Sequence, residues 1–230
     1  MTRVAVLIPA FNAERTLEPV IRAALQQTPD VTVVDDGSRD GTAEVAKRAG
    51  AHVIKHELNR GKGGALKTGF AWACGAGYDG VITLDADGQH LPSEIPKFIG
   101  CYGETGGDLI IGGRAHLFGQ MLPRRRTANR FSAWTISIAS GKNIPDSQSG
   151  YRFYSTRLLR AIKLRDNGFA LESEVIVRAG RAGFNVLTTP IDLGFVDGQS
   201  TSHYKPLKDT WRIARVVTRT WFECVVLRRC

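Results

Sequence analysis

The stretch VITLDADGQH, residues 81–90, joins an apolar run to two aspartates that stand two positions apart. Residues 81–84 are typical of a buried strand, and open α/β sheets bind ligands at the carboxyl ends of their strands. Side chains two positions apart in an extended chain share a face, so Asp85 and Asp87 can converge on one ion. Carboxylate oxygens suit Mg²⁺ or Mn²⁺, and such an ion suits a diphosphate. The alternative is a plain turn, since Asp and Gly favour turns.

Strand-like and helical patterns alternate around this stretch, which predicts an α/β domain with a mostly parallel central sheet flanked by helices. The expected strands are residues 4–9, 31–34, 52–55, 81–84, 108–111 and 186–190, and the expected helices are 12–27, 42–49, 61–73, 94–101, 129–139 and 172–182. A basic loop is expected at residues 124–126. Right-handed crossovers place the loops after the parallel strands at one edge of the sheet.

The composition is that of a soluble globular protein, with 230 residues, 43% hydrophobic and 23% charged, and no linker that divides it. The net charge of +9 is uneven: residues 1–115 hold 12 basic and 14 acidic residues, which leaves 19 basic and 8 acidic in 116–230. A basic half suggests an anionic partner such as a membrane surface, a phosphate-bearing substrate or nucleic acid. The simpler interpretation is solubility.

The C-terminal residues 207–230 are expected to form a basic amphipathic helix, distinct from a domain at 1–206. Basic residues follow one face and apolar residues a neighbouring face, namely Lys208, Arg212, Arg215 and Arg219 against Trp211, Ala214, Val217, Trp221 and Val225. Such a helix lies on a membrane surface, packs on its own domain or packs on a membrane-embedded partner subunit. No apolar run reaches the ~20 residues that span a bilayer.

Two further features favour a cytoplasmic protein, peripheral at the membrane face. No secretory signal pattern is expected at the N-terminus. The cysteines Cys74, Cys101, Cys224 and Cys230 form no CxxC pair, so reduced thiols are expected instead of a disulfide framework.

The glycine-rich loop at residues 61–64 fits no familiar nucleotide motif. Leu66 stands where both GxxxxGK[ST] and GxGxxG require glycine, so neither an ATPase nor a dinucleotide fold is supported. The loop precedes a helix whose N-terminal amides, with Lys62 and Lys67, can meet a phosphate. A plain structural turn accounts for the loop equally well.

Taken together, IPAFNAE (8–14), VDDGSRDGT (34–42), NRGKGGA (59–65) and DADGQH (85–90) resemble glycosyltransferase family 2. DADGQH and DSQSGYR (146–152) look most like its polyprenyl-phosphate (dolichyl-phosphate) mannosyl or glucosyl transferases. The resemblance covers about residues 4–205 and implies a GT-A fold. It implies transfer of a hexose, with inversion, from a nucleotide sugar of the GDP-mannose or UDP-glucose type to a polyprenyl phosphate.

The resemblance, with the local patterns, assigns expected roles to individual residues. Expected nucleotide-sugar contacts are Pro9, Phe11, Glu14, Asp36, Lys62, Gly63 and Asp85. Expected ligands of Mg²⁺ or Mn²⁺ are Asp85, Asp87 and Gln89, and expected catalytic residues are Asp87, Arg114 and Arg126. Expected acceptor contacts are Arg124, Arg125, Gln148, Arg152, His203 and Lys205, although residues 199–205 depart from the shorter Ser-Lys pattern usual in the family. Phe11 replaces a common Tyr, which loses a hydroxyl but keeps a ring.

A phosphate monoester, with a second pKa of about 6, is already a nucleophile at neutral pH, so this acceptor needs no general base. One alternative is the same fold with a soluble saccharide or protein-linked acceptor, for which a carboxylate base is expected. The other is a nucleic-acid-binding protein, which leaves the acidic and glycine-rich loops unexplained, so no nucleic-acid partner is expected.

Purely structural roles are the simpler interpretation for several of the remaining residues. The run at 124–126 can be a solvated charge run. Phe131, Trp134 and Ile138 are expected in the core. Glu172 and Glu174 are expected to favour a helix dipole, with Glu174 a weak site candidate.

Overall fold

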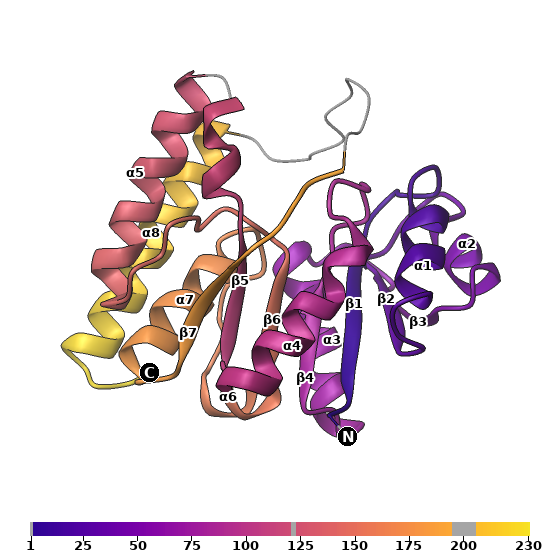
Figure 1. Ribbon diagram of the computed structural model, residues 1–230, viewed down its shortest axis with the longest axis horizontal. Coiled ribbons are helices and arrows are strands. Elements are labelled where there is room, and N and C mark those ends of the chain that lie inside the picture. The colour runs from indigo at the N-terminus through magenta and orange to yellow at the C-terminus, as the bar shows by residue number, and fades with distance from the viewer. Residues whose placement is uncertain (1, 121–122, 195–205) are drawn as a thin grey trace.

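Seven strands form one mixed sheet in the order β3-β2-β1-β4-β6-β5-β7 (Figure 1). The computed structural model describes residues 2–120, 123–194 and 206–230, without the side chains of residues 120, 123–125 and 206–210. The strands are β1 Val4–Ala10, β2 Val31–Asp35, β3 His52–Lys55, β4 Gly80–Thr83, β5 Leu109–Gly113, β6 Arg152–Ser155 and β7 Val186–Pro190. Only β6 runs antiparallel to its neighbours among these strands, so the sheet is mostly parallel as expected.

Helices cover both faces of the sheet (Figure 1). They are α1 Leu17–Leu25, α2 Thr42–Arg48, α3 Lys62–Gly75, α4 Ile95–Thr105, α5 Pro123–Ser140, α6 Thr156–Ala161, α7 Leu171–Arg181 and α8 Pro206–Val225, with 3₁₀ turns η1 Pro92–Glu94 and η2 Ala115–Gln120. Residues 124–126, expected as a loop, therefore lie in α5. That expectation is wrong because α5 begins at Pro123, whereas the apolar spacing in the sequence indicates a helix only from residue 129.

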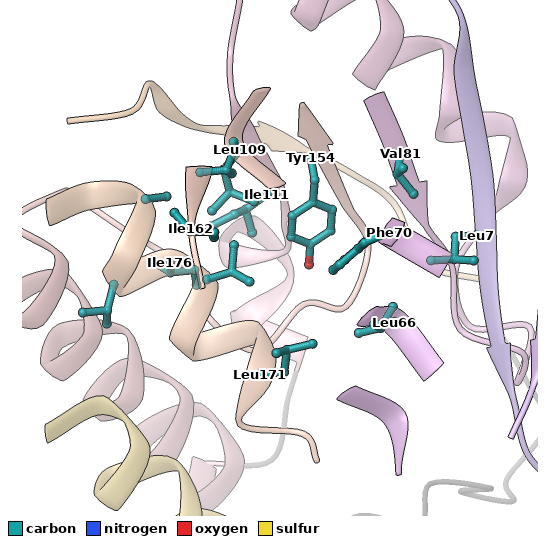
Figure 2. Close-up of a cluster of buried hydrophobic side chains, with 14 of the residues drawn as sticks. Leu7, Leu66, Phe70, Val81, Leu109, Ile111, Tyr154, Ile162, Leu171 and Ile176 are labelled. Carbon is teal, nitrogen blue, oxygen red and sulfur yellow. The ribbon is translucent and has the colours of Figure 1, made fainter. Parts of the chain in front are cut away.

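Two hydrophobic clusters hold the layers together, one on each face of the sheet. Leu7 of β1 belongs to the cluster that joins the sheet to the helices α3, α5 and α7, which Figure 2 shows with Phe70 and Tyr154 at its centre. Ile8, the next residue, belongs to the cluster on the opposite face, which includes residues of α1, α2 and α4. Consecutive residues of a strand point to opposite faces, and a strand buried on both faces reads as a continuous apolar run. The strand β1 is visible in the sequence for this reason.

Buried charges attach α8 to α7. Arg178 of α7 is 1% exposed, and its Nη2 lies 2.9 Å from Glu174 Oε1 and 2.6 Å from Glu223 Oε2 of α8. Arg219 of α8 reaches the same two carboxylates at 3.6 and 3.8 Å. The carboxylate of Glu174 also accepts the backbone N–H groups of residues 165 and 166. Arg219 and Glu223 therefore connect α8 to α7 through charged contacts.

The helices α5 and α8 lie side by side at one end of the molecule and leave large apolar side chains exposed (Figure 1). Phe131, Trp134 and Ile138 of α5 are 64%, 60% and 56% exposed, so the expectation that they belong to the core is wrong. Exposed apolar side chains of the C-terminal segment are Trp211, Trp221, Phe222, Val225, Val226 and Leu227. We call these nine residues the exposed apolar set. None of the described helices is both long and apolar enough to cross a bilayer.

A disulfide joins Cys224, in the last turn of α8, to Cys230 beyond the helix, against the expectation of reduced thiols throughout. The spacing of the two residues matches no metal or redox motif. The helix end folds back, and this fold brings the two sulfurs together. Cys74 and Cys101 remain free thiols, as expected.

Candidate active site at the carboxyl edge of the sheet

The loops after β1 and β2 are bonded to one another. Asn12 adopts a left-handed conformation with φ of 50°, its N–H donates to Ser38 Oγ at 2.9 Å, and its side-chain oxygen accepts the N–H of Arg39 at 3.0 Å. The carboxylate of Glu14 accepts the N–H of Gly41 at 3.1 Å. Pro9 and Phe11 are half-buried beside them. These loops form a rigid rim at the end of the sheet, and their contact with a nucleoside stays a prediction.

Asp36 is buried and holds the glycine-rich loop in place. Its carboxylate accepts the backbone N–H groups of Arg60 and Gly61 at 2.9 and 2.8 Å, and Oδ1 lies 2.7 Å from His56 Nδ1. Gly61 has a φ of +84°, a conformation that glycine adopts without strain. Asp36 therefore positions the start of α3, whether or not it also meets the ligand.

Gly63 allows close packing in the first turn of α3. A Cβ at this position would lie 2.7 Å from the carbonyl carbon of Asn167 and 2.7 Å from the oxygen of Gly168. The glycine motif therefore brings the loop before α7 against the start of α3, next to Lys62.

Lys62, the first residue of α3, lies between two carboxylates from different parts of the chain. Its Nζ is 2.7 Å from Asp85 Oδ1 and 3.4 Å from Glu172 Oε2. Burial opposes the charge on Lys62, but Asp85 and Glu172 outweigh it and raise the pKa of Lys62 above its usual value. Burial likewise opposes the charge on Asp85, and Lys62 overcomes it and lowers the pKa of Asp85 to about 2. Both groups are charged at neutral pH.

His90 lies beneath the aspartates as a neutral support. Burial lowers the pKa of His90 to about 4, so its Nδ1 can accept the backbone N–H of Asp85 at 3.1 Å. The ring also packs against that of Tyr151, at 5.0 Å between centroids. His90 thus fixes the backbone that carries the acidic pair.

Asp87 has no cationic partner among the described residues and lies half-exposed next to Asp85. Burial and the negative charge of Asp85 raise the pKa of Asp87, although the N–H of Gln89 donates to its Oδ1 at 3.0 Å. No three His, Cys, Asp or Glu side chains in the described part of the chain come together as a metal-binding group. Two carboxylates still fit Mg²⁺ or Mn²⁺, because these ions are held in nucleotide sites by one or two carboxylates plus phosphate oxygens and water.

The loop at residues 146–152 is bonded to the site from the antiparallel side. Arg114, just after β5, donates to Asp146 from Nε at 2.7 Å and from Nη2 at 3.2 Å. Gln148 donates from Nε2 to Ser132 Oγ of α5 at 2.7 Å. Thr83 at the end of β4 donates to the carbonyl oxygen of Gly150 at 2.7 Å. These bonds therefore connect residues 146–150 to the ends of β5 and β4 and to α5, and they hold Arg114 and Gln148 on this side of the site.

Arg152 does not face the solvent. It is 1% exposed, and its guanidinium donates to the carbonyl oxygens of Ser149, Ser147 and Glu172 at 2.6, 2.9 and 2.7 Å. The sequence pattern placed Arg152 at the acceptor, whereas the structure uses it to hold the loop and the start of α7. Burial among carbonyl groups, which the sequence does not reveal, explains the difference.

The structure describes only some of the remaining predicted acceptor residues in full. Arg126 is exposed on α5, and the backbone of Arg124 and Arg125 lies in the same helix. His203 and Lys205 lie outside the described residues.

Glu172 and Gly150 belong to the site, although no role there was expected for either residue. The sequence suggested only a dipole effect for Glu172 at the start of α7. Its Oε1 is buried without a hydrogen-bond partner among the described residues. Gly150 lies beside it, because a Cβ there would be 3.1 Å from Glu172 Oε1, 3.0 Å from Asp85 Oδ2 and 2.9 Å from Lys62 Nζ.

The arrangement combines a carboxylate pair, a buried lysine and a nearby arginine below a rim of bonded loops. Carboxylates with room for oxygen ligands can hold a divalent cation on a diphosphate, and such a cation stabilises a departing nucleoside diphosphate. The site is therefore suited to chemistry on an anionic, oxygen-rich ligand.

Known proteins are similar to this chain in sequence and in fold. A sequence model described as "Glycosyl transferase family 2" matches residues 5–163. An undecaprenyl-phosphate mannosyltransferase from Micrococcus luteus is 33% identical over 203 residues, 82% of each chain. A UDP-N-acetylglucosamine–dolichyl-phosphate N-acetylglucosaminyltransferase from Methanococcus voltae is 30% identical over 80% of this chain and 83% of its own.

Among solved structures, the fold is similar to that of glucosyl-3-phosphoglycerate synthase from Mycobacterium tuberculosis, crystallised with Mn²⁺, UDP and phosphoglyceric acid. The TM-score is 0.73 at 21% identity, and the match covers 96% of this chain and 78% of that one.

Proposed function

The chain belongs to glycosyl transferase family 2, and from this premise we propose that it transfers a hexose from a nucleotide diphosphate sugar to a polyprenyl phosphate, with inversion. The observation that carries the proposal is the acidic pair Asp85 and Asp87 beneath the bonded loops at the carboxyl edge of the sheet. Two relatives named for different sugars share a lipid phosphate in their names. The acceptor class is therefore better supported than the donor sugar, which we leave between GDP-mannose and UDP-glucose types.

Asp85 and Asp87, with Gln89, are the residues that would hold Mg²⁺ or Mn²⁺. The bound ion would neutralise the charge that grows on the leaving diphosphate. The carboxylate of Asp87 supports this assignment, because it has no ion-pair partner among the described residues, and burial, with a smaller effect of the negative charge of Asp85, raises its pKa.

The nucleoside would lie on the rim formed by Pro9, Phe11 and Glu14. The half-buried ring of Phe11 offers a stacking surface, and the bonded loops after β1 and β2 keep that surface in place. Rigid loops reduce the entropy lost when a ligand binds.

The acceptor phosphate would approach from the side of Arg114 and Arg126, with the basic start of α5 and residues 203 and 205 as further candidates. Arg114 already pairs with Asp146, so its guanidinium has a fixed orientation toward the site. A phosphate is a nucleophile without deprotonation at neutral pH, so the carboxylates of the site are free to serve the cation and the lysine.

A membrane surface would deliver the lipid acceptor to this edge. The support is the exposed apolar set itself, which meets solvent while Arg212 pairs with Asp166 at 2.9 Å and Arg219 with Glu174, so that these two basic side chains are tied to the domain. Tryptophan is enriched where proteins meet the membrane–water interface. We therefore propose peripheral attachment at the cytoplasmic face, with direct lipid contact favoured over a membrane-embedded partner subunit.

A transfer assay tests the proposal. Purified protein is incubated with polyprenyl phosphate, Mn²⁺ and labelled GDP-mannose, UDP-glucose or UDP-N-acetylglucosamine. A labelled glycolipid that disappears with EDTA is the expected result. No glycolipid from any of these donors, with transfer to a soluble saccharide instead, would favour the alternative acceptor class.

A further inference from the structure

Lys62 occupies the position next to Asp85 where a divalent cation would approach. The ammonium is 2.7 Å from Asp85 Oδ1, and the side chain is 16% exposed. A cation bound by Asp85 would place two further positive charges close to this ammonium. Like charges this close repel strongly where water is largely excluded.

Glu172 offers the ammonium a second position. Its Oε2 is already 3.4 Å from Nζ, and its Oε1 is buried without a partner among the described residues. An unpartnered buried carboxylate oxygen is costly, so a structure that retains one has room for another donor. The free oxygen can accept the hydrogen bond that Lys62 now gives to Asp85.

Gly150 allows the three charged groups to lie this close together. The place that a Cβ would take at Gly150 is within 3.1 Å of Lys62 Nζ, Asp85 Oδ2 and Glu172 Oε1, so any side chain there would crowd all three groups. The ammonium is already 3.4 Å from Glu172 Oε2, so a change of side-chain rotamer at Lys62 is enough to bring it onto that carboxylate.

We propose that Lys62 is a resident counter-cation of Asp85, which a divalent cation displaces toward Glu172. The inference rests on the proposed function, because it takes Asp85 as a metal ligand. Glu172 acts as a positioning residue: it lowers the cost of moving Lys62 and so strengthens metal binding without touching the metal. Gly150 is required because a side chain at this position would crowd Lys62, Asp85 and Glu172.

Mn²⁺ binding, measured by electron paramagnetic resonance with Mn²⁺ alone and with UDP or GDP added, tests this proposal. We expect Glu172→Gln to weaken Mn²⁺ binding about tenfold, the size typical of a lost supporting contact. Lys62→Met removes the competing cation and should strengthen binding. Glu104→Gln, the same charge change at an exposed residue of α4, should leave binding unchanged.

The double variant separates displacement from a simple charge effect. If Glu172 acts through Lys62, then Glu172→Gln has less than about a twofold effect when Lys62 is already Met, because the two residues are coupled. An equal loss in both backgrounds would overturn the proposal and indicate that Glu172 acts directly on the ion. Weaker binding in Lys62→Met, with the thermal midpoint retained, would also overturn it.

Gly150→Ala provides a second route that leaves every charge in place. The methyl group would crowd Lys62 Nζ and Glu172 Oε1, at 2.9 and 3.1 Å, and would hinder their approach, so we expect Mn²⁺ binding to weaken as in Glu172→Gln. Unchanged binding in a folded Gly150→Ala protein would contradict the role given to Gly150. Failure of the wild-type protein to bind Mn²⁺ under any of these conditions would contradict the proposed function itself, whereas wild-type binding with unaffected variants contradicts only the displacement.

Discussion

Replacing Arg178 with Met should destabilise the protein by about 3–5 kcal/mol, the cost of breaking a buried ion pair and leaving charge behind. Arg178 is 1% exposed, and its Nη2 contacts both Glu174 and Glu223 within 3 Å. Its Nη1 also donates to the carbonyl oxygens of Arg229 and Cys230 at 3.4 and 3.3 Å. Methionine keeps much of the stem but leaves the fully buried Glu174 with two backbone donors and the more distant Arg219.

Urea unfolding measures this loss. With a slope of about 3 kcal/mol per molar urea, the midpoint should fall by about 1–1.7 M. Arg22→Met is the matched control, because Arg22 forms a 2.8 Å pair with Glu18 on the exposed side of α1, and exposed pairs contribute about 0.3–0.5 kcal/mol. A destabilisation of Arg178→Met below about 1 kcal/mol, or equal to that of the control, would refute the view that this arginine fastens α8 to α7.

Three further predictions concern other parts of the molecule. Burial alone would raise the pKa of Asp108, but its bonds from Arg157, Ser155 and Asn185 lower it below the usual value. The contribution of Asp108 to stability is therefore present above the unfolded pKa of about 3.9 and is lost as the pH falls through the folded pKa. Asp108→Asn should lower the thermal midpoint at pH 7, and the midpoints of the variant and the wild type should converge toward pH 3. A difference between the two midpoints that stays constant with pH would contradict this. Trp134→Ser should reduce co-sedimentation with anionic vesicles, whereas Leu58→Ser, at a still more exposed apolar residue near β3, should not; equal loss would argue against attachment through α5. Asp87→Asn should abolish sugar transfer while the midpoint is retained or raised, since relieved burial of charge favours folding; full activity would remove Asp87 from the metal site.

Much of the sheet could be predicted because its strands are buried on both faces. The run before Asp85 and the run at residues 4–9 are continuously apolar, and parallel strands covered by helices require such runs. The position of the acidic pair followed from the general location of ligands at strand ends. Family resemblance then supplied roles that spacing alone does not give.

The orientation of the helices could not be predicted in the same way. Periodicity shows which side chains share a face of α5 or α8, but not which face meets the domain. Trp134 was expected inside and lies outside, and the sequence left the surroundings of Arg219 open, whereas the structure pairs it with buried Glu174. The deciding contacts come from acidic residues on other elements, such as Asp166 and Glu223, whose positions depend on the folded chain.

The burial of single side chains in the site is also a tertiary property. Arg152 looked like an acceptor ligand because it is an arginine in a motif, yet three carbonyl groups surround it. Glu172 looked like a helix-dipole residue, yet it is within reach of Lys62. Neither contact has a local sequence signature.

The most direct test of sugar transfer to a lipid phosphate compares two acceptors of equal chain length, a polyprenyl phosphate and the corresponding polyprenol. Both are offered to the purified protein in the same vesicles with Mn²⁺ and the donor that the transfer assay identifies. Labelled glycolipid from the phosphate alone is the predicted result, because the site provides cationic groups for a phosphate and its carboxylates are assigned to the cation and to Lys62. Equal transfer to the polyprenol would contradict it.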